Sequence, residues 1–343
     1  MNLTNQEIAP RTKKICIGKL NQIRTSPAYD AYWYFAGERQ KIFYSRIRNP
    51  ELEKWSEDEI LNNFKFTNAY RASDRVSQYL IKNVIYSDNY EKNESNVFFR
   101  IMLFKLFNKI ETWELLEKRI GVLTYESFDF KRYDQVLTNA IEQKERIYSA
   151  AYIMPSGKTS FGYPKKHRNH LTLLEALIKN ETYKRIIYSS NMEEGYKVLL
   201  SCPTLGPFLA YQLITDINYS ELTDFSEREF VMPGPGALDG ISKCFINKGG
   251  FSESELIKYV CDHQEKEFEK RNIDFKNLWS RPLQLIDCQN LFCEISKYTR
   301  VSHPQIEGLA NRKKIKQKFQ ANRTVIDYWY PPKWGINERI YFV

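Results

Sequence analysis

The sequence lacks the hydrophobic segments that direct a protein into a membrane or out of the cell. Residues 1–14 contain no apolar core of the kind that a signal peptide requires. The longest apolar-rich stretch, residues 97–107, is interrupted by Arg100 and Lys105 and is too short to span a bilayer. We therefore predict a cytoplasmic protein with no membrane association.

Cysteine is also sparse, which limits the scope for disulfides and metal sites. The chain has 6 cysteines among 343 residues, and no two of them form a Cys-x-x-Cys pair. Cys244, Cys261, Cys288 and Cys293 are poorly spaced for a zinc site or an iron–sulfur cluster. We predict reduced thiols, no bound metal and no cofactor.

Alternating apolar and polar residues, internal repeats and low-complexity linkers are almost absent, whereas helical periodicity covers most of the chain. The predicted fold class is therefore mainly α. We predict one compact helical domain over residues 1–343, with an irregular basic arm over 1–27 and an aromatic tail over 320–343. Any internal cleft is expected between residues 28–190 and 191–320.

Two helical segments bear on a functional site. Residues 97–119 are apolar on most sides and predict one buried central helix that ends at Gly121. Arg71, Asp74 and Arg75 follow helical spacing and are expected to share one helix face. Such a cluster is either a salt-bridged surface or a substrate-binding site, and both interpretations stay open.

The composition is rich in aromatic and basic residues. Hydrophobic residues make up 42% and aromatic residues 15% of the chain, which is typical of a folded protein. The 51 Lys and Arg exceed the 42 Asp and Glu, which gives a net charge of +9. This balance suits an anionic polymer such as DNA, and no protein partner is evident.

Two glycine turns lie close together in the sequence. Gly206 lies between two apolar helical runs, and Gly234 and Gly236 precede a helix that starts near Ala237. Turns of this kind present backbone N–H groups that bind phosphate. We predict that these three glycines contact the DNA backbone, with close packing inside the protein as the alternative.

A basic loop occupies residues 150–170. Its Ser-Gly-Lys-Thr-Ser segment begins at Ser156, but a phosphate-binding loop needs glycine where Tyr152 stands. The loop also contains Lys165, Lys166 and Arg168 among aromatic residues, which is a pattern suited to contact with a nucleic-acid backbone. A solvated surface loop is the alternative.

A polar stripe lies on an otherwise apolar helix near the C-terminal end. Asp287, Asn290, Glu294 and Lys297 have helical spacing, so they are expected on one helix face. Burial of unpaired polar groups costs free energy, so the stripe faces either a polar cleft or a structural network. We predict that Asn290 and Lys297 bind substrate, together with Arg71, Asp74 and Arg75.

Carboxylates are the candidates for catalysis. The 4 histidines show no Ser-His-Asp or Cys-His arrangement. Glu229 precedes the second glycine turn and Asp239 lies in the helix after it, while Asp287 and Glu294 belong to the polar stripe. Any of these four could act in acid–base catalysis, and the sequence does not choose among them.

Five segments together resemble one protein family. It is the α-glutamyl/putrescinyl thymine pyrophosphorylase family, which shares a helical module with 5-hydroxymethyluracil DNA kinases and is similar to helix-hairpin-helix DNA glycosylases. One branch is an antiphage glycosylase that removes glucosylated hydroxymethylcytosine from phage DNA. The segments that carry the resemblance are FKFTNAYRASDR (64–75), VFFRIMLFKLFNKIETWE (97–114), CPTLGPFLAYQLITDI (202–217), FVMPGPGALDGISKCF (230–245) and DCQNLFCEISKYTR (287–300).

The resemblance implies a helix-hairpin-helix, glycosylase-like architecture and a monofunctional DNA N-glycosylase. Its substrate would be a hypermodified pyrimidine, such as glucosylated hydroxymethylcytosine, flipped out of double-stranded phage DNA in antiphage defence. Kinases of the family carry a separate phosphate-binding-loop domain, which this chain is expected to lack. Two alternatives stay open: a pyrophosphorylase-like enzyme that installs a hypermodified thymine, and a non-catalytic reader of modified DNA.

Overall fold

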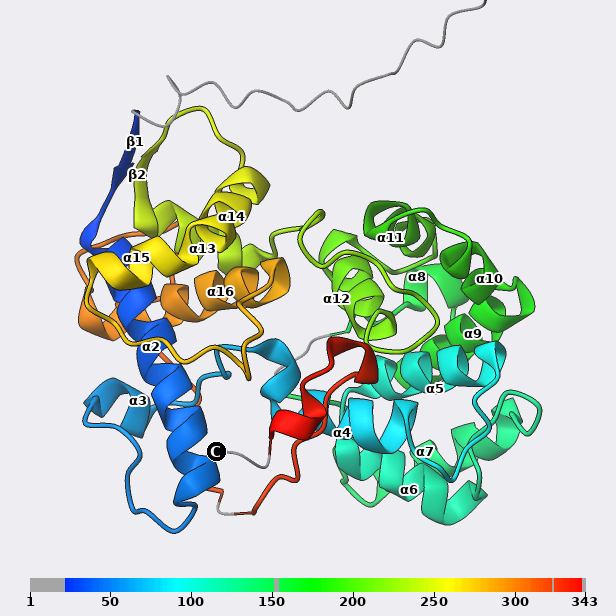
Figure 1. Cartoon of the computed structure of the whole chain (residues 1–343). Coiled ribbons are helices and arrows are strands. Elements are labelled where there is room, and N and C mark those ends of the chain that lie inside the picture. The colour runs from blue at the N-terminus through cyan, green and yellow to red at the C-terminus, as the bar shows by residue number, and fades with distance from the viewer. Residues whose placement is uncertain (1–21, 151–153, 323, 341–343) are drawn as a thin grey trace, which may run out of the picture.

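A computed structural model describes residues 22–150, 154–322 and 324–340. It confirms the prediction of a mainly helical fold, while the glycosylase-like architecture stays a prediction. Two groups of helices lie side by side in Figure 1, and the C-terminal segment runs between them. No helix in the described part of the chain is long and apolar enough to cross a membrane.

The first group surrounds a long N-terminal helix and a long C-terminal helix that pack together. Its helices are α2 (Pro27–Arg48), α3 (Glu59–Asn63), α13 (Pro235–Cys244), α14 (Glu253–Asp262), α15 (Gln264–Lys270) and α16 (Leu285–Ser302). The strands β1 (Ile23–Thr25) and β2 (Phe245–Lys248) pair antiparallel, with Ile23 opposite Lys248. Helix α13 packs closely on α16, since a Cβ at Gly240 would lie 1.9 Å from the carbonyl oxygen of Phe292.

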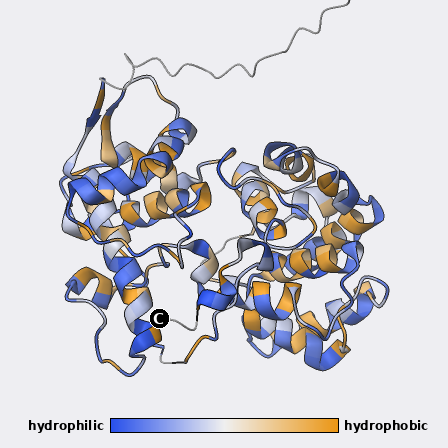
Figure 2. Cartoon of the chain, in the orientation of Figure 1, coloured by the Kyte–Doolittle hydropathy of each residue, from blue (hydrophilic) through white to orange (hydrophobic). Residues whose placement is uncertain are grey.

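The second group surrounds α5, whose ribbon is largely coloured as hydrophobic in Figure 2. Its helices are α4 (Arg75–Tyr79), the π-helix η2 (Leu80–Ile85), α5 (Glu94–Phe107), α6 (Ile110–Ile120), α7 (Phe130–Glu142), α8 (Lys158–Phe161), α9 (Lys166–Lys179), α10 (Thr182–Ile187), α11 (Met192–Leu200) and α12 (Pro207–Ile217). The predicted single helix over residues 97–119 is wrong. Asn108 adopts φ 49° and ends α5, and a second helix follows and ends at Gly121 as expected.

The shared helix face predicted for Arg71, Asp74 and Arg75 is also wrong. Arg71 begins the 3₁₀ helix η1 (Arg71–Ser73), and Asp74 then adopts an extended conformation with ψ 143°. The Asp74 carboxylate accepts a hydrogen bond from the backbone N–H of Asn68 at 2.9 Å, which stabilises a turn in place of a continuous helix. Arg71 is consequently buried, whereas Arg75 is exposed.

The C-terminal aromatic segment lies between the two groups of helices (Figure 1). Tyr330 is fully buried, and its hydroxyl hydrogen-bonds with the hydroxyl of Ser73 at 2.9 Å. The indole of Trp334 packs edge-on against Tyr219 and lies 3.8 Å from the guanidinium of Arg281. The segment therefore contacts both groups, and the predicted internal cleft stays a prediction.

Candidate functional site

A buried charge network lies where the two groups of helices meet. The guanidinium of Arg71 lies 2.8 Å from a carboxylate oxygen of Asp216 on α12. It also donates to the hydroxyl of Tyr219 at 3.0 Å and to the side-chain oxygen of Gln212 at 3.1 Å. Burial opposes the charge on Arg71, but Asp216 keeps its pKa well above the ordinary value.

A second buried cation, Lys105, also pairs with the Asp216 carboxylate. Lys105 on α5 lies 3.2 Å from the other carboxylate oxygen of Asp216. Burial lowers the pKa of Lys105, and the Asp216 carboxylate partly offsets this effect. One buried carboxylate therefore pairs with two buried cations that come from separate elements.

Asp287 connects this network to α16. Its carboxylate accepts hydrogen bonds from the backbone N–H groups of Arg71 at 2.8 Å and Gln284 at 3.0 Å. Burial raises the pKa of Asp287 to about 6, while these two N–H groups favour its charged form. We call Arg71, Lys105, Gln212, Asp216, Tyr219 and Asp287 the junction network. A catalytic role for Asp287 stays a prediction.

A partly exposed polar face lies beside the junction network, and we define it as Asp74, Asn290, Glu294 and Lys297. Glu294 forms an ion pair with Lys297 at 2.8 Å and accepts a hydrogen bond from the backbone N–H of Thr67 at 3.3 Å. Burial raises the pKa of Asp74 to about 7, and the charge of Glu294 acts in the same direction. The structure thus brings together two sequence segments that lie more than 200 residues apart.

The other two candidate carboxylates lie outside both clusters. Asp239 accepts a hydrogen bond from the backbone N–H of Ala310 at 2.6 Å and another from the hydroxyl of Ser296, and Lys243 lies 3.8 Å away. These contacts tie the chain after α16 to α13. Glu229 is exposed. Catalysis by either residue stays a prediction.

The glycine turns differ in what surrounds them. A Cβ at Gly234 would lie 2.5 Å from the ring of Phe208, and a Cβ at Gly236 would lie 2.3 Å from the sulfur of Cys293. Packing inside the protein therefore explains both glycines. Gly206 is exposed, and a Cβ there would meet no atom within 4 Å. DNA contact at all three glycines stays a prediction.

The segment predicted as a basic loop lies beside the first glycine turn, since a Cβ at Gly157 would be 3.7 Å from Thr204, but its Lys166 and Arg168 belong to helix α9. Arg168 makes two hydrogen bonds of 2.8 Å to Asp134, so its charge is already paired. Lys166 lies 4.4 Å from the ring centre of Tyr148, and Lys165 is exposed. Lys165 also lies 4.0 Å from a carboxylate oxygen of Glu142, and DNA contact by all three cations stays a prediction.

Sequence reasoning missed four members of the junction network: Lys105, Gln212, Asp216 and Tyr219. Lys105 and Asp216 stand in helices that are otherwise mostly apolar. A charged residue at such a position is buried only with a partner, so a search for complementary charges in apolar helices would have singled out both.

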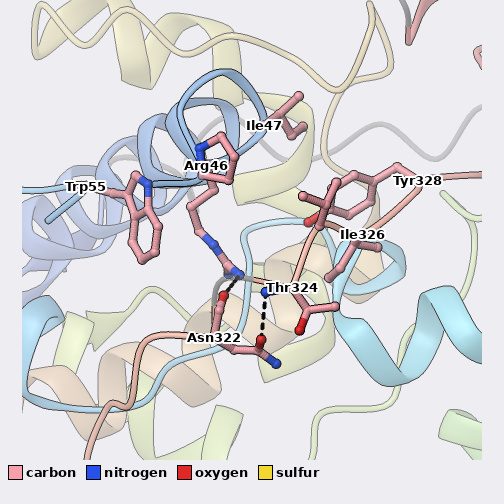
Figure 3. A pocket seen from close by; sticks show the side chains of 9 residues that line it. Arg46, Ile47, Trp55, Asn322, Thr324, Ile326 and Tyr328 are labelled. Carbon is pink, nitrogen blue, oxygen red and sulfur yellow. Dashed lines mark hydrogen bonds between the residues drawn. The ribbon is translucent and has the colours of Figure 1, made fainter. Parts of the chain in front are cut away.

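A small cavity lies at the end of α2, and Figure 3 shows the side chains that line it. Arg46 extends past Trp55 and donates a hydrogen bond to the carbonyl oxygen of Asn322 at 2.9 Å. The cavity volume of about 60 Å³ is well below the roughly 300–1,000 Å³ of typical ligand pockets. Within the described ranges, no three His, Cys, Asp or Glu side chains are grouped to hold a metal ion.

Comparisons with known proteins give two matches. Residues 26–308 match the family described as "5-hmdU DNA kinase, helical domain". The 5-hmdU DNA kinase of Bacillus phage SP10 is 25% identical to this chain over 288 residues. That match covers 79% of this chain and 44% of the phage protein, so the chain spans less than half the length of this relative. No solved structure matches the chain.

These matches correct the predicted enzyme class. The resemblance to the helical module of hydroxymethyluracil DNA kinases is confirmed. The prediction of a monofunctional DNA N-glycosylase is wrong, because the named relative is a kinase. A kinase transfers a phosphoryl group and does not hydrolyse N-glycosyl bonds. Neither match supports the antiphage glycosylase branch.

Proposed function

We propose that this chain binds DNA that contains a hydroxymethylated pyrimidine. The premise is that the chain belongs to the family of the helical domain of 5-hmdU DNA kinases. This proposal corresponds to one of the two alternatives left open by the sequence, a non-catalytic reader of modified DNA. It is supported by the family match over residues 26–308 and by the net charge of +9. The observation that carries it is the polar face beside the junction network.

A hydroxymethyl group on a base presents one hydrogen-bond donor and one acceptor. The polar face offers the complementary groups: Asp74 and Glu294 carry acceptors, and Asn290 and Lys297 carry donors. Asn290 lies one helical turn from Glu294, and its amide nitrogen donates to no residue that the structure describes. A hydroxyl placed here would find both kinds of partner.

Selectivity follows from the same chemistry. A site that hydrogen-bonds a substrate hydroxyl strongly rejects the analogue that lacks it, because polar groups are then left unpaired. Thymine and 5-hydroxymethyluracil differ by this one hydroxyl. The expected result is tighter binding of the hydroxymethylated duplex.

The test compares two duplexes that are identical except for thymine or 5-hydroxymethyluracil at one position, with affinity read by fluorescence anisotropy. Asn290→Ala and Lys297→Gln should each reduce the preference about 5- to 10-fold, the loss of roughly one hydrogen bond. Asn139→Ala and Lys184→Gln are matched controls, since Lys184 also pairs with a glutamate three residues away, and both should keep the preference. Equal affinity of the wild type for both duplexes would falsify the proposal.

A further inference from the structure

A short basic segment follows the part of the chain that matches the family. It comprises residues 312–318, with the sequence RKKIKQK, and we call it the basic strap. It contains five cations and no acidic residue, whereas the whole chain has a net charge of only +9. The positive charge of the protein is therefore concentrated in this segment.

The backbone of this region is held against the first group of helices. Hydrogen bonds fix it at three places: to α13, to α16 and to the end of α3. These bonds are Ala310 N–H to Asp239 (2.6 Å), Arg300 to the carbonyl of Lys314 (3.3 Å), Lys65 N–H to the carbonyl of Gln317 (3.1 Å) and Phe319 N–H to the carbonyl of Asn63 (3.0 Å). The cations are thus presented on an ordered support, which reduces the entropy lost when a ligand binds.

The cations of the strap are exposed and, among the described residues, lack acidic partners along the whole segment. All five are exposed, and none lies within 4.0 Å of a carboxylate in the described part of the chain. Some surface lysines elsewhere pair with a nearby acid, such as Lys92 with Asp88, Lys179 with Glu175 and Lys197 with Glu193, whereas the strap gathers five such unpaired cations within one short segment. The strap therefore carries uncompensated charge that favours an anionic partner.

Burial within the strap separates its apolar residue from its cations. Ile315 is buried and Phe319, directly after the strap, is half-buried, whereas Lys314, Lys316 and Lys318 are exposed. Five exposed cations within seven consecutive residues suit a linear polyanion better than a single small anion.

We propose that the basic strap binds the phosphate backbone of double-stranded DNA. This assignment rests on the proposed function, because the strap and the polar face would then hold the same duplex. The strap supplies affinity that does not depend on base sequence, and the polar face supplies the preference for the modified base.

The experiment measures binding to the thymine and 5-hydroxymethyluracil duplexes over a series of salt concentrations. The strap variant is R312Q/K314Q/K316Q/K318Q, and the control variant K92Q/K179Q/K184Q/K197Q removes the same charge from paired surface lysines. The slope of log K against log salt changes by about 0.9 for each phosphate contact. The magnitude of this slope should therefore be about 3 to 4 smaller for the strap variant than for the wild type. The control variant should keep the wild-type slope.

The outcomes separate the two proposals. A strap variant with the wild-type slope would overturn the role of the strap, whatever the preference between duplexes. A reduced slope with no preference in the wild type would support the strap and overturn the proposed function. Vesicles of phosphatidylserine and phosphatidylcholine serve as a second polyanion. Strap-dependent binding to these vesicles, without strap-dependent binding to DNA, would overturn the assignment to DNA.

Discussion

At the junction, Arg71 and Lys105 are buried and share the carboxylate of Asp216, whereas the five cations of the basic strap lie on the surface without such a partner. Buried charges must be paired because removal from water is costly, so their geometry is set by the fold. Exposed cations are hydrated and cost little when unpaired, so they stay available to a ligand. The same type of residue therefore pairs with a buried acid in one region and is proposed to bind DNA in the other.

Replacement of Asp216 tests the buried side of this comparison and should have the largest effect. Asp216→Asn leaves Arg71 and Lys105 buried beside a neutral group, and the free energy of unfolding should fall by about 3–5 kcal/mol. Asp88→Asn is the control, because Asp88 pairs with Lys92 on the surface, and it should cost no more than about 0.5 kcal/mol. Urea unfolding measures both, and equal losses would contradict the distinction between the two regions.

The pH dependence of stability tests the polar face next. Because burial raises the pKa of Asp74 from 3.8 to about 7, the folded protein binds more protons than the unfolded chain between these values. The free energy of unfolding should therefore fall as pH rises from about 4 to 7. Asp74→Asn can still accept the hydrogen bond from Asn68, so it should remove the part of this decrease that Asp74 contributes, while Asp287, with a pKa of about 6, contributes the remainder.

The variant should consequently be more stable than the wild type above pH 7, by roughly 4 kcal/mol at about 1.36 kcal/mol per pKa unit. Below pH 4 the two proteins should have similar stability. Urea unfolding at a series of pH values gives both curves. Parallel curves for the two proteins would show that Asp74 keeps an ordinary pKa.

Substitutions of two glycines should have the smallest effects on stability. They compare a closely packed position, Gly240, with an exposed one, Gly206. Gly240→Ala places a Cβ against the carbonyl of Phe292 and should cost about 1–3 kcal/mol of unfolding free energy. Gly206→Ala has open space and an ordinary φ of −75°, so stability should change by less than about 0.5 kcal/mol. If Gly206→Ala also leaves DNA affinity unchanged, the predicted backbone contact at this turn is wrong.

Particular helices show how far the sequence was informative about the fold. The spacing of Asp287, Asn290, Glu294 and Lys297 predicts one helix, and α16 contains all four residues. The helix predicted over residues 97–119 breaks at Asn108, because a left-handed residue there does not alter the pattern of apolar residues. The predicted common face of Arg71 and Asp74 fails because the Asp74 side chain binds a nearby backbone N–H group, an interaction that spacing does not reveal.

The candidate site was predictable only in pieces. The polar residues of α16 and the cluster at Arg71 stood out in the sequence, and the structure joins them through the contact of Asp287 with the Arg71 backbone. Nothing in the chain order paired Lys105 with Asp216, although each was an evident exception in its apolar helix. The position of Trp334 against Tyr219 and Arg281 could not be predicted from the order of residues either.

The sequence by itself determined the helical fold class, the excess of positive charge and the isolated charged residues in apolar helices. These features depend on composition and on neighbours within a few residues along the chain. Only the tertiary structure decided which charges neutralise each other at the junction and which remain exposed on the basic strap. Pairing depends on distances between residues that are far apart in sequence, and the folding of the whole chain sets those distances.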